Sequence, residues 1–210
     1  EEKLAAIEQA ADEVISGQLL DNFPLVVWQT GSGTQSNMNA NEVIANRALE
    51  IMGHQYGEYQ YCSPNDHVNC SQSTNDAYPT AIHLGMYATH LKLVEHLKQL
   101  IESFEKKAAE FADVLKMGRT QLEDAVPMTL GQTFHGFASI LRDEIVHLNE
   151  AAEDFLTINM GATAIGTGIC AEPGYAELCT ENIARITGWK IRLTGDLVGA
   201  TSDTSCLVGY

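Results

Sequence analysis

Apolar residues recur at intervals of three and four along two long stretches of this chain of 210 residues. The first stretch runs from about Thr80 to Asp113 and carries a second apolar row beside the first. At ~1.5 Å per residue it predicts a helix of about 50 Å. The second stretch runs from Leu130 to Phe155. So wide a stripe on such long helices is typical of burial on several sides, and it predicts an all-α, long-helix bundle.

Shorter patterns surround these two helices. Helical spacing over residues 1–17 and over Glu42 to Met52 ends at a glycine in each case, which is a common stop signal. A further helix is expected at about Ala176–Thr187. Leu25–Trp28 is expected as a strand or an extended segment, Trp189–Leu193 as an extended segment, and Ala200–Tyr210 as a capped helix start. Because helices are rarely cut at their start, we expect the chain to be a fragment.

Three clusters of hydroxyl and amide residues lie beside the expected helices, at Gln29–Asn41, Ser71–Pro79 and Lys116–Met128. Pro79 suits the first turn of a helix, so the residues before it are expected at or just before a helix N-terminus. Free N–H groups and the helix dipole favour an anion there. Each cluster alone is typical of an ordinary helix cap or of a connector between elements. Three such clusters on long helices favour a shared site for an anionic ligand.

The charge balance and the cysteines narrow the classes of partner. A net charge of −16 and a pI near 4.6 argue against nucleic acid and anionic membranes as partners, but not against a small anionic substrate. No apolar run approaches the ~20 residues of a membrane span, and the N-terminus has no signal-peptide pattern. Five cysteines without a Cys-x-x-Cys motif indicate reduced thiols and a cytoplasmic location.

The clusters are rich in neutral donors and poor in groups that titrate near neutrality. The glycines at 31 and 33 are not followed by the lysine of a phosphate-binding loop, and no βαβ pattern surrounds them. The seven histidines are scattered, no metal-ligand spacing is present, and no nucleophile–base set can be read from the spacing. We therefore expect a surface that binds carboxylates, with no cofactor and no metal, and with no evident acid–base residue.

Four motifs, in this order along the chain, resemble the fumarase/aspartase superfamily. They are Gly31-Ser-Gly-Thr-Gln-Ser-Asn-Met-Asn39 with Asn41 to Arg47, Pro64 to Asn69 with Ser71 to Thr80, Gly118-Arg-Thr-Gln-Leu-Glu-Asp-Ala125, and Gly161 to Gly168. The resemblance covers essentially the whole chain. It implies a helical homotetramer with a central helix bundle, in which three subunits build each active site.

The resemblance also implies a reaction, the anti elimination of a succinyl-type substrate to fumarate through an aci-carboxylate intermediate. Residues that match the substrate-binding positions of the family are Thr34, Ser73, Thr74, Asn75 and Thr120, with Ser32 matching a further position in fumarases. Gln121 stands where many members carry a histidine. The serine base of the family lies in a C-terminal motif that this sequence lacks, so no catalytic base is assigned here.

The same resemblance sets expectations for the domains. Residues 1–115 correspond to the end of an N-terminal domain that runs into the first bundle helix, and residues 116–210 to the start of the central bundle. We expect a piece of less than half of a full chain, inactive alone. Ser63 replaces a histidine that opens a secondary anion site in fumarases, so that site is not expected.

Two activities of the family compete. Gly31–Gln35 is more similar to fumarases, which interconvert L-malate and fumarate. Gly57–Tyr61, Asp76–Pro79, Met117–Leu122 and Ala200–Asp203 are more similar to members that release ammonia from L-aspartate. The second group is longer and includes Gln121, so deamination is the leading interpretation. A non-catalytic helical oligomer is the alternative from another class, which the intact hydroxyl set disfavours.

Overall fold

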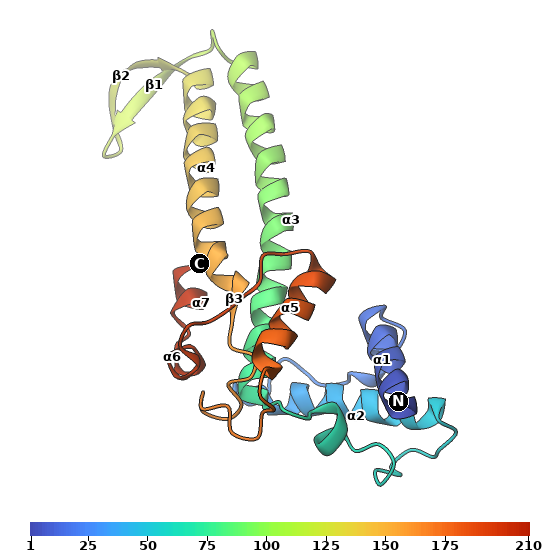
Figure 1. Cartoon of the computed structure of the whole chain (residues 1–210). Coiled ribbons are helices and arrows are strands. Elements are labelled where there is room, and N and C mark those ends of the chain that lie inside the picture. Colours follow the sequence, from blue (N-terminus) through green and yellow to red (C-terminus); the bar gives the residue numbers. More distant parts are fainter. The chain divides into compact units, whose positions relative to one another are not determined.

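The computed structural model describes all 210 residues and is dominated by helices (Figure 1). The α-helices are α1 (Glu2–Ile15), α2 (Thr34–Ile51), α3 (Thr74–Glu110), α4 (Leu130–Ala152), α5 (Tyr175–Thr187), α6 (Leu197–Ser202) and α7 (Ser205–Gly209). Short turns of other helix types are η1 (Leu20–Asn22), η2 (Pro64–Val68) and η3 (Glu153–Leu156). The strands are β1 (Leu115–Thr120), β2 (Glu123–Thr129), β3 (Thr157–Ile158) and β4 (Arg192–Leu193). The predicted helical fold is confirmed, and no helix combines the length and apolarity that crossing a membrane requires.

The chain divides into two compact units. Unit 1 contains residues 1–83 and 156–204, and unit 2 contains residues 84–155 and 205–210. Helix α3 starts in unit 1 and continues into unit 2. The two expected domains, with their boundary at residue 115, stay a prediction.

The predicted long helix is confirmed by α3, whose 37 residues run without a break. Its start is earlier than predicted, because Pro79 lies inside the helix rather than in its first turn. Proline has no N–H, so the carbonyl four residues earlier, that of Asn75, lacks its helical partner. The side chain of Asn159 fills this gap, with its Nδ2 donating to the Asn75 carbonyl over 3.1 Å.

Helix α2 also begins earlier than predicted, at Thr34 inside the expected connector. Gly33 caps it in the left-handed conformation with φ of 76°. A Cβ at this position would stand 2.1 Å from the ring of Tyr78, so only glycine fits. The many amides of this segment therefore belong to the helix itself.

The third polar cluster was expected as a loop at a helix end, and this prediction is wrong. Strands β1 and β2 form an antiparallel hairpin there, with Leu115 paired to Thr129 and Thr120 to Glu123 (Figure 1). Residues Leu25–Trp28, expected as a strand or an extended segment, form no strand. Trp189–Leu193 does contribute β4, which pairs in parallel with β3.

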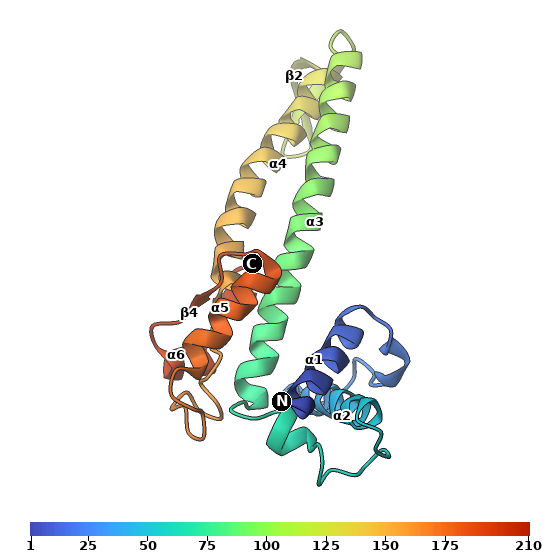
Figure 2. The ribbon, with the colours of Figure 1, turned by 45° about the vertical axis from the view of Figure 1, so that its right-hand side comes forward.

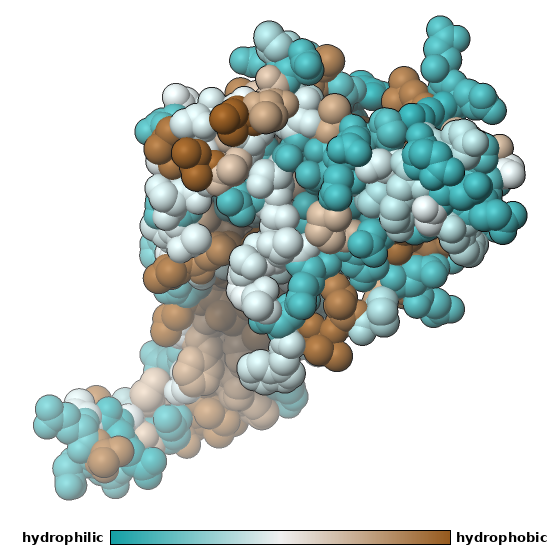
Figure 3. All heavy atoms as spheres, turned by 90° about the horizontal axis from the view of Figure 1, so that it is seen from below, coloured by the Kyte–Doolittle hydropathy of each residue, from teal (hydrophilic) through white to brown (hydrophobic).

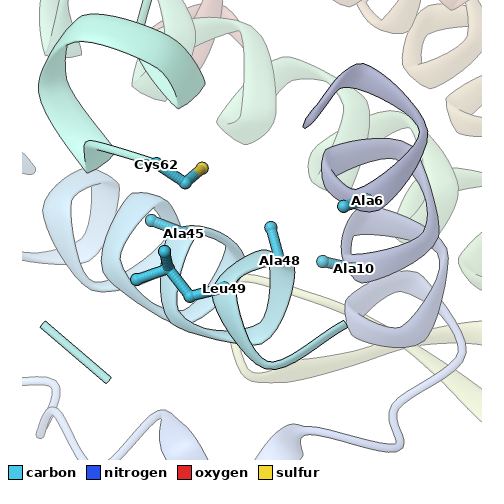
Figure 4. Close-up of a cluster of buried hydrophobic side chains, with 6 residues drawn as sticks. All are labelled: Ala6, Ala10, Ala45, Ala48, Leu49 and Cys62. Atoms are coloured by element: carbon cyan, nitrogen blue, oxygen red, sulfur yellow. The ribbon is translucent and has the colours of Figure 1, made fainter. Parts of the chain in front are cut away.

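Each unit has its own packing. In unit 1, small side chains let α1 and α2 approach closely around Leu49 and Cys62, which are fully buried (Figure 4). In unit 2, α3 and α4 run side by side (Figures 1 and 2). Their rings meet there, with Phe104 and Phe137 centred 5.7 Å apart. Apolar side chains also remain on the surface, where they appear as brown patches among polar residues in Figure 3.

Candidate functional site

The first turns of α2 and α3 lie next to each other in unit 1. Gly33 packs against the ring of Tyr78 at the start of this contact. One turn further along α2, Asn37 Nδ2 donates to Thr74 Oγ1 over 3.1 Å. The first turns of two helices are thus brought to one place, and such turns favour anions where their N–H groups are free.

A row of hydroxyls leads into α2. Ser32 Oγ lies 3.3 Å from Thr30 Oγ1 and 3.5 Å from Thr34 Oγ1. Ser32 and Thr34 are both exposed, so their hydroxyls are available to a ligand.

The turn that leads into α3 is held by a network of amides. Asn69 Oδ1 accepts from Asn37 over 3.3 Å and from the buried Asn41 over 2.9 Å. Its own Nδ2 donates to the Gln72 carbonyl over 3.2 Å. Ser71, which follows, adopts a positive φ of 63°. The side chains of α2 therefore fix the backbone just ahead of Ser73 and Thr74.

Asp76 is the most deeply buried polar residue of the site, with no exposed surface. Its Oδ1 accepts from the N–H of Ser73 over 2.8 Å, as the acidic residue of a capping box does. Its Oδ2 accepts from two more N–H groups, those of Gly161 over 3.1 Å and Thr163 over 2.9 Å. One carboxylate thus ties the first turn of α3 to a loop more than eighty residues away.

That loop, Gly161–Gly168, is attached to the first turn of α3 by Asn75 as well. Asn75 Nδ2 donates to the Ala164 carbonyl over 2.7 Å. Thr163 holds a left-handed φ of 57°, which is rare for a β-branched residue and costs about 1–3 kcal/mol. Its hydroxyl is buried without a hydrogen-bond partner. Such strain persists only where the surroundings impose it, and the Asp76 carboxylate is part of those surroundings.

Two groups near Asp76 are held in their neutral forms. Burial is the main cause that raises the pKa of Tyr175, and it also raises the pKa of the Cys179 thiol. The fully buried Cys62 has a raised pKa for the same reason. None of these three is an anionic nucleophile near pH 7. Nowhere do three or more His, Cys, Asp or Glu side chains gather so as to hold a metal ion.

The other two predicted binding residues, Thr120 and Gln121, lie in unit 2 at the tip of the β1–β2 hairpin. Gln121 and Leu122 form its two-residue turn, with φ of 46° and 72°. Positive φ at both positions is typical of a type I′ turn, which usually carries Asn-Gly. Both Thr120 and Gln121 are exposed. Apart from the strand ladder, the tip has one ion pair, Arg119 to Asp124, at 3.2 Å on the surface.

The structure thus groups five of the seven predicted residues within unit 1 and leaves two on the hairpin of unit 2. The five are Ser32, Thr34, Ser73, Thr74 and Asn75. The sequence predicts a helix cap within Ser71–Pro79, but it does not predict the bonds of Asp76 to Gly161 and Thr163. The Ser-x-x-Asp spacing of a capping box was the available signal, and its link to the distant loop had none.

Comparisons with known proteins agree on one family. A family model described as Lyase matches residues 1–210. Aspartate ammonia-lyase of Escherichia coli K12 is 53% identical over 204 residues, which cover 97% of this chain and 43% of that protein. Aspartate ammonia-lyase of Pseudomonas aeruginosa is 54% identical over 209 residues, which cover 99% of this chain and 44% of that protein. The chain therefore spans less than half the length of the curated relatives it matches.

Solved structures show the same fold. A structure described as fumarate lyase:delta crystallin from Brucella melitensis bound to cobalt has a TM-score of 0.95 and 51% identity, covering 99% of this chain and 45% of that one. A class II fumarase from Schistosoma mansoni has a TM-score of 0.91 and 34% identity, covering 100% of this chain and 47% of that one.

Proposed function

Because this chain belongs to the lyase family of the fumarase/aspartase superfamily, we propose that the complete protein is an aspartate ammonia-lyase. It converts L-aspartate to fumarate and ammonia. Relatives of that name are 53–54% identical over nearly the whole chain, and they support this choice within the family. The observation that carries the proposal is the cluster of neutral donors at the first turns of α2 and α3.

The chemistry of this cluster suits an elimination through a carbanion. When the proton at C3 is removed, the electron pair moves into the neighbouring carboxylate and gives a dianion, the aci-carboxylate. Collapse of this dianion forms the double bond and expels ammonia from C2. Hydroxyls and amides that are already oriented stabilise the extra charge without rearranging. We assign this role to Ser73, Thr74, Asn75 and Thr120, with Ser32, Thr34 and Gln121 as the other substrate-binding residues.

The donor cluster contains no base for the C3 proton. Its hydroxyls and amides do not accept protons at neutral pH. Asp76, its one carboxylate, is buried and accepts three backbone N–H groups. We therefore assign the base to a residue outside this cluster. Sites shared between the subunits of a cytoplasmic homotetramer, as the family resemblance implies, are part of the same proposal.

Gln121 favours ammonia over water as the leaving group. Addition of water to fumarate needs an activated water, and a histidine with a pKa near neutrality suits that task. An amide does not titrate in that range. In the corresponding addition to fumarate, ammonia reacts as a neutral nucleophile and needs no such activation. The Gln121 amide still offers an NH₂ donor to a substrate carboxylate.

The test is to assay the complete protein on L-aspartate and on L-malate, with and without Gln121→His. We expect fumarate from aspartate, and a gain of malate turnover in Gln121→His relative to the unmodified protein. Leu122→His is the matched control, because it places an imidazole at the neighbouring position of the same turn. Efficient turnover of malate with none of aspartate would contradict the proposal and favour a fumarase. A lack of turnover of both substrates would favour the non-catalytic oligomer.

Fumarase is the second candidate. The hydroxyl row at Ser32 and Thr34 carries it, since Gly31–Gln35 is more similar to fumarases. The similar class II fumarase from Schistosoma mansoni shares the fold at a lower identity of 34%. The same pair of assays separates the two activities.

A further inference from the structure

We infer that Asp76 is a positioning residue for the elimination, one that fixes the donors for the aci-carboxylate without touching the substrate. This inference rests on the proposed function, because it concerns the same site. It starts from the three backbone N–H groups that the buried Asp76 carboxylate accepts, from Ser73, Gly161 and Thr163. Asp76 has no exposed surface, so its own contact with a ligand is excluded.

The bond to Ser73 sets the geometry of the turn that carries the donors. Ser73 N–H donates to Asp76 Oδ1, and Ser73 Oγ in turn accepts from the N–H of Asn75 over 3.2 Å. Thr74 lies between these two residues, and its Oγ1 accepts a hydrogen bond from Asn37 Nδ2 of α2. If the bond from the Ser73 N–H to Asp76 is broken, the backbone that positions the Ser73 hydroxyl and the side chains of Thr74 and Asn75 is held less firmly.

The bonds from Asp76 to the N–H groups of Gly161 and Thr163 attach this turn to the loop Gly161–Gly168. Asn75 Nδ2 and the Asn75 carbonyl add two further links to the same region, through Ala164 and Asn159. The left-handed φ of Thr163 is strained, so contacts with the surrounding residues hold the loop in this conformation. The Asp76 side chain therefore accepts hydrogen bonds from the backbone of both segments, the turn at Ser73 and the loop Gly161–Gly168.

A negative charge beside a dicarboxylate site disfavours the binding of anions. A general electrostatic effect of Asp76 would weaken the binding of anions, so removing the charge would tighten it. A positioning effect predicts the opposite for the dianion, because displaced donors stabilise it less. The two effects have opposite signs, and this makes the role of Asp76 measurable.

Asp76→Asn separates the bonds of the two oxygens. The amide oxygen can still accept from Gly161 and Thr163, but the amide NH₂ then faces the Ser73 N–H, and two donors cannot bond each other. The variant thus releases Ser73 while it keeps the volume of the side chain and the contact to the loop.

The experiment uses the complete protein and two dianionic ligands. Succinate resembles the ground state, whereas the nitronate of 3-nitropropionate carries the charge distribution of an aci-carboxylate. For Asp76→Asn we expect kcat with L-aspartate and the affinity for the nitronate both to fall by about 10- to 100-fold. The affinity for succinate should change by less than about 3-fold, since ground-state binding depends less on these donors.

Thr180→Val is the matched control. Thr180 is buried in α5, and its hydroxyl bonds only the Ala176 carbonyl of its own helix over 2.7 Å. This variant should alter stability and leave the ratio of nitronate to succinate affinity unchanged. Should Asp76→Asn fail to fold, Asn159→Ala replaces it, because it removes the donor to the Asn75 carbonyl and leaves Asp76 intact. It should lower the same ratio by a smaller factor.

The outcomes distinguish this inference from the proposed function. An unchanged ratio in the folded variant, or tighter binding of both ligands, would overturn the positioning role. Turnover of malate in place of aspartate by the unmodified protein would refute the proposed function alone, because both reactions pass through the same aci-carboxylate. If the unmodified protein binds neither ligand, both proposals fall.

Discussion

The first turns of α2 and α3 and the tip of the β1–β2 hairpin both present hydroxyls and amides, yet they are held by different forces. The helix turns are fixed by side chains that bond backbone from several segments, with Asp76 and Asn69 at the centres. The hairpin tip has only its strand ladder and an exposed ion pair. Matching residue types therefore do not imply equal rigidity.

Removing one hydroxyl from each place should separate function from stability. In the complete protein, Thr74→Ala and Thr120→Ala should each lower kcat by about 10²–10³, since each removes a donor to the developing dianion. Only Thr74→Ala should also lower the free energy of unfolding, by about 1 kcal/mol, because it breaks the bond from Asn37.

Steady-state kinetics and urea unfolding measure the two effects. Thr89→Ala is the control, since the exposed Thr89 bonds only the Gly85 carbonyl of its own helix. Unchanged kcat in both variants would refute the assignment of these residues.

Gly33 tests how tightly the helix turns are packed. Gly33→Ala should lower the free energy of unfolding by about 2–4 kcal/mol, because a Cβ meets the Tyr78 ring and φ is left-handed. Gly31→Ala is the control, since it has open space around its Cα and no left-handed φ. Equal midpoints of urea unfolding for the two variants would contradict the close packing.

The hairpin tip should become more stable when its strain is relieved. Leu122→Gly removes the cost of a left-handed φ at an exposed residue and should stabilise the hairpin by about 1 kcal/mol. Slower hydrogen exchange of the amides in β1 and β2 is the measurement. Leu115→Gly, at the exposed start of β1, should speed the same exchange.

The half-buried thiol of Cys179 and phenol of Tyr175 in α5 predict a smaller effect on stability at alkaline pH. Because the pKa of Cys179 and that of Tyr175 are raised in the folded protein, the unfolded chain releases these protons first. The free energy of unfolding should therefore fall as the pH rises above about 9. Cys179→Ala should make this decline shallower in urea titrations between pH 7 and 10.5, whereas Cys170→Ala, which removes an exposed thiol, should not.

The helices could be predicted from the sequence because their evidence is local. The spacing of apolar residues located α1, α4 and α5 to within a few residues, and it located α3 with a start at Thr80 instead of Thr74. The start of α2 was missed because Gly, Ser and Asn are common in connectors, and only the contact of Gly33 with Tyr78 shows why a helix starts there. The hairpin was missed because Gln121-Leu122 lacks the Asn-Gly that marks a type I′ turn.

The site could be predicted only in part for the same reason. The resemblance named the hydroxyls, which lie in motifs a few residues long. The bonds from Asp76 to Gly161 and Thr163 join positions 85 and 87 apart in the chain. No local pattern encodes such a pairing, so the shared carboxylate appears only in the folded structure.

Pro79 also has a consequence for the order of folding. From Pro79 onwards α3 can form quickly from contacts between near neighbours, but the turn before it lacks a helical bond until Asn159 arrives, 84 residues later in the chain. The donor-bearing turn should therefore gain its last backbone partner late, after the body of the helix. During synthesis this bond waits until the segment beyond α4 has left the ribosome, so the turn assigned to recognition is completed only after both long helices have been made.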